Sequence, residues 1–169
     1  KCLSGSFVRA AFIMFLHRWA RSAQLNNGTP LRIGFLCDGL GHFHAAALNA
    51  QWALTVCAAA EIQKHLFNRL KRKYGDVVIG DVFGPESRFV ENAVMDAICA
   101  SPPCQPYTRT NHGAGKGDPR RDIFLRVIEI IGNSWRADRR LKWVLIENTA
   151  SIQHSHEGSI PLHEIQAFW

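Results

Sequence analysis

The sequence lacks the features that mark several special classes of protein. Its five cysteines are an odd number and form no Cys-x-x-Cys pair, which argues against a disulfide framework and against a zinc ribbon. No apolar run is long enough to span a membrane, and neither internal repeats nor low-complexity tracts occur. We therefore expect an intracellular globular protein with reduced thiols and no membrane partner.

Acidic residues are missing from the start of the chain. The first is Asp38, and five Lys and Arg residues precede it. A basic, acid-free start is typical of an organelle targeting segment, which is one interpretation of residues 1–25. Over the whole chain, 20 Lys and Arg exceed 14 Asp and Glu, so the net charge is +6. This balance favours a polyanionic partner such as nucleic acid, with a merely solvated basic surface as the alternative.

What the chain does contain is an alternating pattern in 169 residues, the size of one ordinary domain. After a turn-rich linker at residues 26–30, strand-like apolar stretches alternate with helix-like amphipathic stretches. Asp118 can cap the last helix, and Pro119 suits its first turn. The alternation predicts an α/β fold with a parallel sheet. The expected strands are 32–36, 54–60, 77–80, 96–100 and 143–146, and the expected helices are 42–52, 62–73 and 119–135.

Residues suited to ligand binding follow several of these strands. Parallel α/β sheets bind ligands beyond the carboxyl ends of their strands, so this placement indicates a cofactor-dependent enzyme. An acid in such a position can also be a plain helix cap, and an unrelated nucleotide-binding α/β enzyme is an alternative. The residues at the expected strand ends are Asp38 to Gly41, Glu61, Asp81, Cys104 and Glu147.

Two short motifs give this pattern a specific meaning. A lone cysteine is more often a buried packing residue than a nucleophile. Here, however, Pro103-Cys104-Gln105-Pro106, followed by Thr108, resembles the Pro-Cys-Gln catalytic loop of the cytosine-5 DNA methyltransferases. Glu147-Asn148-Thr149 resembles the Glu-Asn-Val motif of the same family. The resemblance implies a Rossmann-like, S-adenosylmethionine-dependent methyltransferase fold over residues 31–169, with helices on both faces of a mostly parallel sheet.

The resemblance also implies a mechanism and a partner. Cys104 would add to C6 of a flipped-out cytosine in DNA, because a thiolate is nucleophilic at neutral pH. Glu147 would hold the base, with Pro103, Gln105 and Asn148 beside the two reacting groups. Asp118-Pro119-Arg120 matches the family's Asp-x-Arg segment. The residues expected to contact DNA are Thr108, Arg109, Lys116, Arg120 and Arg121.

The cofactor implied is S-adenosyl-L-methionine. Residues 35–43 resemble the family's Phe-x-Gly-x-Gly-Gly-Phe loop, except that Cys37 replaces the usual phenylalanine and His42 replaces the third glycine. Glu61 matches the acid that holds the ribose, and Asp81 matches the acid that meets the adenine amino group. The expected cofactor-binding residues are Phe35, Asp38, Gly39, Leu40, Gly41, Glu61, Ile62, Asp81 and Val82.

The N-terminal residues 1–25 have a second interpretation. Leu3-Ser4-Gly5-Ser6-Phe7 and the apolar stretch after it resemble the family's last motif, which completes the cofactor pocket. Its position before the glycine loop would indicate a circular permutation. We prefer this interpretation to a targeting segment, and it adds Ser6 and Phe7 to the cofactor site.

Other family landmarks are not found. The chain contains neither a Gln-x-Arg-x-Arg segment after residue 149 nor a recognisable target recognition domain. We therefore expect a truncated chain, one subunit of a split enzyme whose second chain carries that domain, or a degenerate member. The degenerate case is a catalytically silent, DNA-binding or partner-activating subunit.

Substrate, location and metal complete the expectations. The Cys-Phe-Thr segment of the related transfer-RNA methyltransferases is absent, which favours DNA as the substrate. The family implies the nucleus in a eukaryote and the cytoplasm in a bacterium or virus. Two histidine pairs, His42/His44 and His154/His156, have no further ligand at matching spacing, so no metal site is expected.

Overall fold

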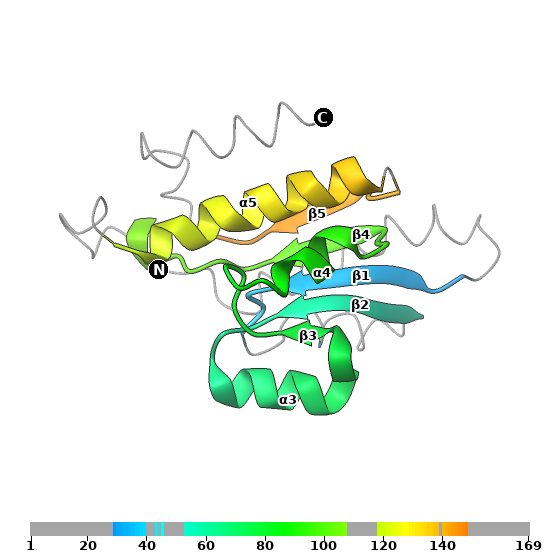
Figure 1. The fold of residues 1–169 in the computed structure, drawn as a ribbon, viewed down its shortest axis with the longest axis horizontal. Helices are drawn as coiled ribbons and strands as arrows, with labels where there is room; N and C mark the ends of the chain where they lie inside the picture. Colours follow the sequence, from blue (N-terminus) through cyan, green and yellow to red (C-terminus); the bar gives the residue numbers. More distant parts are fainter. Residues whose placement is uncertain are drawn as a thin grey trace.

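The computed structural model describes residues 29–39, 43, 45, 53–107, 118–138 and 140–148. These residues form a five-stranded sheet of order β3-β2-β1-β4-β5, in which each neighbouring pair is parallel (Figure 1). The sheet confirms the predicted parallel α/β fold. No helix among the described residues is long and apolar enough to cross a membrane. The strands are β1 Leu31–Leu36, β2 Leu54–Ala60, β3 Val78–Ile79, β4 Ala97–Ala100 and β5 Trp143–Ile146.

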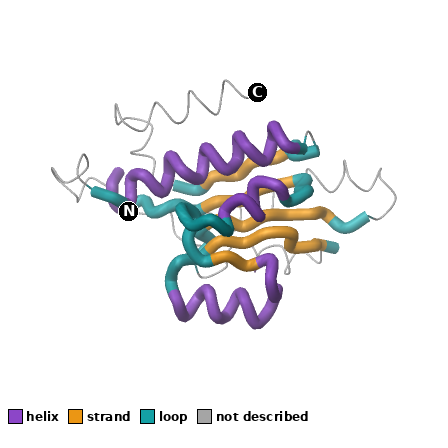
Figure 2. Tube along the Cα trace, in the orientation of Figure 1, coloured by secondary structure: helices purple, strands orange, loops and turns teal. Residues whose placement is uncertain are grey.

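Helices connect the strands, as Figure 2 shows. The helix expected at 62–73 begins two residues later, and the one expected at 119–135 begins at Arg120. Asp118 nevertheless accepts the backbone N–H of Arg120 at 3.0 Å, which supports the first turn of that helix. Of the helix expected at 42–52, the structure describes only Phe43 and Ala45, both helical. The described helices are α3 Lys64–Tyr74, η1 Gly75–Val77, α4 Ser87–Asn92, η2 Gln105–Tyr107 and α5 Arg120–Ala137.

Each face of the sheet has its own core. On one face, Leu36 and Ile98 pack with Val127 and Ile130 of α5. On the other, Phe35 and Cys99 belong to a cluster that includes the inner side of α3. This arrangement follows from strand geometry, because successive side chains point to opposite faces. The predicted placement of helices on both faces is therefore confirmed.

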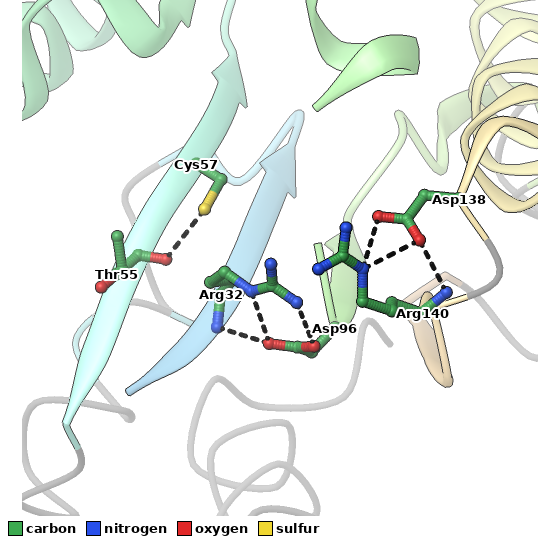
Figure 3. A network of polar contacts seen from close by, with 6 residues as sticks. All are labelled: Arg32, Thr55, Cys57, Asp96, Asp138 and Arg140. Atoms are coloured by element: carbon green, nitrogen blue, oxygen red, sulfur yellow. Dashed lines mark hydrogen bonds and ion pairs between the residues drawn. The ribbon is translucent and has the colours of Figure 1, made fainter. Parts of the chain in front are cut away.

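The ends at which the strands begin are joined by a polar network (Figure 3). The Arg32 guanidinium binds Asp96 through Nη2 to Oδ1 at 2.7 Å and Nε to Oδ2 at 3.1 Å. The backbone N–H groups of Lys142 and Trp143 donate to the Asp96 carbonyl at 3.0 and 3.3 Å. Asp138 binds Arg140 just before β5. The network fixes the starts of β1, β4 and β5 on the side opposite the candidate site.

Candidate active site

The two motifs with catalytic resemblance follow adjacent strands. Cys104 comes after β4 and Glu147 directly after β5, and β4 pairs with β5. The Glu147 backbone N–H donates to the Ala100 carbonyl at 2.8 Å, which continues the ladder one step past the strands. The order of the sheet therefore brings these sequence-distant motifs to one edge.

Side-chain hydrogen bonds tie the two motifs together. The Ser101 hydroxyl donates to Glu147 Oε2 at 3.1 Å, and the Asn148 amide donates to the Pro102 carbonyl at 3.1 Å. The Ser101 backbone N–H binds the Leu36 carbonyl at 3.0 Å, so the segment is also held to β1. Ser101 was not singled out from the sequence, although it lies at the end of an expected strand.

The loop that carries Cys104 is short and stiff. Pro102 and Pro103 fix two φ angles after β4, and residues Gln105–Tyr107 form the 3-10 helix η2. Pro103 and Cys104 are half-buried and Gln105 is exposed, so Cys104 lies on a defined loop that is partly open to solvent. None of the four described cysteines is in a disulfide.

Arg120 lies near Cys104 at the start of α5. Its guanidinium binds Asp118 through Nε to Oδ1 at 2.9 Å and through Nη2 to Oδ2. The Asp118 hydrogen bond raises the pKa of Arg120, and the negative charges of Asp118 and of a Cys104 thiolate add to that effect. The structure thus brings together Cys104, Arg120 and Asp118, while Arg121 is half-buried on the same helix turn.

The expected cofactor residues gather at the ends of β1, β2 and β3. Cys37 has a φ of 55° and Gly39 a φ of 53°, so the chain turns sharply after β1 in a conformation that suits glycine. The Gly39 backbone N–H donates to Glu61 Oε2 at 3.0 Å. Asp38 is buried and accepts the Phe43 N–H at 3.2 Å, and Phe35 is a core residue.

Glu61 fits the role of a ribose acceptor. Its side chain is buried, and its second oxygen accepts the Gln63 N–H at 2.8 Å. A carboxylate has about four lone-pair sites, and these two bonds leave capacity for two hydroxyl donors. Glu61 also holds the turn before α3, although the N-cap of that helix is Gln63 and has no side-chain cap hydrogen bond. Asp81 is exposed and accepts the Phe83 N–H at 2.9 Å.

Two apolar side chains are exposed beside these acids. Ile62 is 67% exposed and Phe83 is 53% exposed, and they follow Glu61 and Asp81 after the paired strands β2 and β3. Val82, which the sequence suggested for the cofactor site, is instead packed in the core beneath α5. The exposure of Phe83 was not predicted, because the alternation of buried and exposed side chains along a strand does not continue into the turn that Asp81 forms. The acids and exposed apolar groups suit a nucleoside with polar hydroxyls and an apolar base.

The other described cysteines differ from Cys104. Burial and the charges of Glu61 and Asp81 raise the pKa of Cys37 to about 12. Complete burial raises the pKa of Cys99 well above its usual range, and burial also raises that of Cys57. A thiol with a raised pKa is rarely a thiolate at neutral pH, so these three are poor nucleophiles.

Arg126 is a second residue that the sequence did not reveal. From α5, it donates through Nε to the Val82 carbonyl at 3.0 Å and through Nη2 to Ser87 Oγ and Glu91 Oε1, both at 2.8 Å. Its Nη1 pairs with Glu129 at 2.7 Å. Arg126 thereby joins the turn after Asp81 to α4 and α5. In the sequence, Arg126 only adjoins the apolar residues of an amphipathic helix, and this pattern does not predict its hydrogen bonds.

Several expected residues lie outside the described part of the chain. No group of three or more His, Cys, Asp or Glu suited to a metal ion occurs among the described residues, and all four paired histidines lie beyond them. The expected site residues that the structure does not describe are Ser6, Phe7, Leu40, Gly41, Thr108, Arg109 and Lys116.

Comparisons with known proteins agree with this geometry. The family model for C-5 cytosine-specific DNA methylases matches residues 31–168. A tRNA (cytosine(38)-C(5))-methyltransferase of Spodoptera frugiperda is 36% identical over 71% of this chain and 36% of its own length. That of Mus musculus is 27% identical over 82% of this chain and 33% of its own. The type II methyltransferase M1.BsuMI of Bacillus subtilis (strain 168) is 26% identical over 78% of this chain and 28% of its own length.

Solved structures show the same fold. The S. pombe Dnmt2 methyltransferase superimposes with a TM-score of 0.60 at 18% identity, over 82% of this chain and 41% of that one. The Entamoeba histolytica methyltransferase EhMeth gives a TM-score of 0.55 at 14% identity, over 82% of this chain and 44% of that one. The chain spans about a third of the length of the curated relatives it matches. Over most of its own length, it belongs to the C-5 cytosine-specific DNA methylase family, whose members use S-adenosylmethionine as methyl donor.

Proposed function

We propose that this protein transfers a methyl group from S-adenosylmethionine to C5 of a cytosine in nucleic acid, with Cys104 as the nucleophile. The observation that carries the proposal is the pair of hydrogen bonds from Ser101 to Glu147 and from Asn148 to Pro102. These bonds hold the acid and the cysteine loop at adjacent strand ends, beside the acids that follow β2 and β3.

The reaction needs a thiolate because C5 of cytosine does not attack a sulfonium methyl directly. The Cys104 thiolate forms a bond to C6, and the electron pair of the C5–C6 double bond makes C5 nucleophilic. Glu147 holds N3 and the exocyclic amine and supplies a proton to N3 as the ring is attacked. After methyl transfer to C5, the C5 proton leaves to solvent. Its electron pair restores the double bond, the S–C6 bond breaks, and N3 returns its proton.

Arg120 supports the nucleophile in this scheme. The attraction between its guanidinium and a Cys104 thiolate stabilises both charges, and Asp118 keeps the guanidinium oriented. From the sequence, Arg120 was expected to contact phosphates. Because its charge acts on Cys104, we assign it first to the thiolate.

The cofactor would lie across the ends of β1, β2 and β3. Gly39 would allow close approach of the backbone, Glu61 would offer acceptors to the ribose, and Asp81, Ile62 and Phe83 would contact the base. S-adenosylmethionine supplies an electrophilic methyl group and leaves as S-adenosylhomocysteine. The target cytosine must leave its stack to reach Cys104, at a cost of a few kcal/mol.

Two nucleic acids are candidate substrates. The sequence favoured DNA, and the match to a type II methyltransferase keeps DNA as a candidate. The names of the mammalian and insect relatives favour transfer RNA. The absent Cys-Phe-Thr segment carries little weight, since the chain spans about a third of those relatives. We therefore place transfer RNA first and DNA second.

A methyl-transfer assay decides between them. The protein is incubated with S-adenosylmethionine labelled in the methyl group and with either unmodified transfer RNA or cytosine-containing duplex DNA. We expect label in transfer RNA, in an acid-stable form at C5, and none with Cys104→Ser. Label in DNA alone would show that DNA, rather than transfer RNA, is the substrate. Label in neither, from a folded protein that binds the cofactor, would support a silent subunit and contradict the proposal.

A further inference from the structure

Helix α3 carries an unusual share of the charge of the protein. Its eleven residues contain five Lys and Arg and no Asp or Glu. The whole chain has a net charge of +6, so the remaining residues, with fifteen basic and fourteen acidic side chains, contribute +1. The basic character that first suggested a polyanionic partner is therefore concentrated on one helix.

The fold presents these charges outward. Leu66 is buried, and Phe67, Leu70 and Tyr74 pack against the core on this face of the sheet. The opposite stripe of the helix is polar, and its spacing of i, i+3, i+4, i+7 marks one continuous face. The residues of that stripe, all exposed, are His65, Asn68, Arg69 and Arg72, and the exposed Lys64 and Lys73 flank it.

Acidic side chains do not neutralise this face. Lys71 pairs with Asp76 at 3.0 Å, whereas Lys64, Arg69 and Arg72 form no ion pair with any residue that the structure describes. Burial lowers the pKa of Lys73, and the nearby positive charge of Arg69 lowers it further. Like charges four residues apart destabilise a helix, so packing rather than surface charge stabilises α3.

Arg120 provides a contrast at the catalytic loop. The sequence assigned it to phosphates, but Asp118 binds it through both oxygens. Arg126 and Arg140, also on the α5 side, are likewise paired with acids. Three cations that form no ion pair among the described residues thus lie together on α3, whereas others, such as Arg88 and Lys142, lie singly on other elements.

We propose that the exposed face of α3 binds the phosphate backbone of the nucleic acid whose cytosine enters the Cys104 site. This inference rests on the proposed function and extends it to a second contact surface. The helix lies at the β3 edge of the sheet, and four strand spacings, about 19 Å, separate β3 from β5. One strand of nucleic acid advances about 3.4 Å per nucleotide, so about six nucleotides cover that span.

The test is a matched pair of triple variants with the same loss of charge. Lys64→Gln/Arg69→Gln/Arg72→Gln removes three cations from α3, and Arg88→Gln/Arg136→Gln/Lys142→Gln removes three exposed cations from α4, α5 and the start of β5. Glutamine keeps good helix propensity, so both variants are expected to melt near the wild-type temperature. Binding of labelled transfer RNA and of duplex DNA is measured by fluorescence anisotropy at several salt concentrations.

We expect the α3 variant to lose about tenfold or more in affinity at moderate salt. The slope of log K against log salt should become shallower by about two, since each lost phosphate contact removes 0.7 to 0.9 from it. KM for the nucleic acid should rise while kcat and the affinity for S-adenosylmethionine stay constant. The control variant should keep a slope within about one unit of wild type.

Equal losses of nucleic-acid affinity in the two variants, or an unchanged salt slope in the α3 variant, would overturn the inference. Binding to phosphatidylserine vesicles is measured as well. An α3 variant that loses vesicle binding but keeps nucleic-acid binding would also overturn it. In each of these cases a wild-type protein that still methylates leaves the proposed function standing. A wild type that methylates neither substrate contradicts the proposed function itself.

Discussion

Cys37 and Cys104 both follow strands at the same edge of the sheet, yet their surroundings differ. Burial and two nearby carboxylates raise the pKa of Cys37 to about 12, and its backbone is held in a left-handed turn. Cys104 is half-buried on a proline-stiffened loop, and its charge interacts with that of Arg120. We expect these surroundings, rather than position at the edge, to decide which thiol reacts.

This difference predicts a pattern of alkylation. With limiting iodoacetamide at neutral pH, we expect Cys104 to be modified first among the described cysteines, because alkylation requires a thiolate. Cys37 and Cys99 should react only after unfolding. Peptide mapping by mass spectrometry measures the order, with Cys104→Ser as control. Faster modification of Cys37 than of Cys104 in the folded protein would contradict this assignment.

Short motifs in the sequence suggested Cys104 and Glu147 as catalytic residues, but not the residues that contact their loops. Ser101 and Arg126 act through contacts to residues 46 and 44 positions away, and no local pattern encodes such partners. Nothing in the sequence indicated that Val82 would be buried and Phe83 exposed after the turn at Asp81. Catalytic groups are recognisable by type and order, whereas positioning groups depend on the three-dimensional packing.

Arg126 leads to a prediction about the cofactor. Arg126→Lys keeps the charge but loses the forked contacts to Val82, Ser87 and Glu91 that fix the turn after Asp81. We expect about tenfold weaker binding of S-adenosylmethionine by calorimetry, which is 1.4 kcal/mol.

A double-mutant cycle distinguishes this role from general destabilisation. If Arg126 acts through the turn, Arg126→Lys should have little further effect on affinity in an Asp81→Ala background. Arg136→Lys, on the exposed side of the same helix, is the matched control. Fully additive effects of the two changes would show that Arg126 does not work through Asp81.

At the scale of elements, long periodic stretches were predictable and short ones were not. The expected bounds of β2 and β5 match the structure residue for residue. Helix α4 was missed because its six residues are too few to show a helical period. β3 is shorter than expected, since Val77 belongs to the preceding 3-10 turn.

The start of the sheet gives a prediction about stability and pH. Burial tends to raise the pKa of Asp96, but hydrogen bonds from the Arg32 side chain and backbone outweigh it, so the pKa lies below its usual value. A carboxyl whose pKa is lowered by folding stabilises the fold above its unfolded pKa of about 3.9. This contribution is lost as the pH falls through the lower, folded value.

Asp96→Asn should therefore destabilise the protein at pH 7 by about 1–3 kcal/mol in urea unfolding, since it removes charged hydrogen bonds to Arg32. The difference from wild type should shrink below about pH 4. Asp76→Asn is the control, because Asp76 is fully exposed and, within the described part of the chain, pairs with Lys71 alone. An effect of Asp96→Asn that does not change between pH 7 and pH 3 would rule out the charged pair as its cause.

At the scale of the whole molecule, charge and chemistry occupy different regions. The motifs proposed as catalytic lie at the ends of β4 and β5, the acids proposed to bind the cofactor at the ends of β2 and β3, and the largest group of cations on α3. A sheet of parallel strands makes this division possible, because its carboxyl ends form one continuous edge. The family assignment and the basic, amphipathic character of residues 62–73 were predictable from the sequence, whereas the exposure and ion pairing of those cations required the fold.

The central claim is that Cys104 attacks the target base, and covalent trapping tests it most directly. The protein is incubated with S-adenosylmethionine and with transfer RNA, or DNA, that carries 5-fluorocytosine. Fluorine at C5 cannot leave as a cation, so elimination stops after methyl transfer with the Cys104 sulfur still bonded to C6. We predict a complex that survives denaturing electrophoresis with the wild type and Cys37→Ser, and none with Cys104→Ser. A trapped complex that persists in Cys104→Ser would contradict the account.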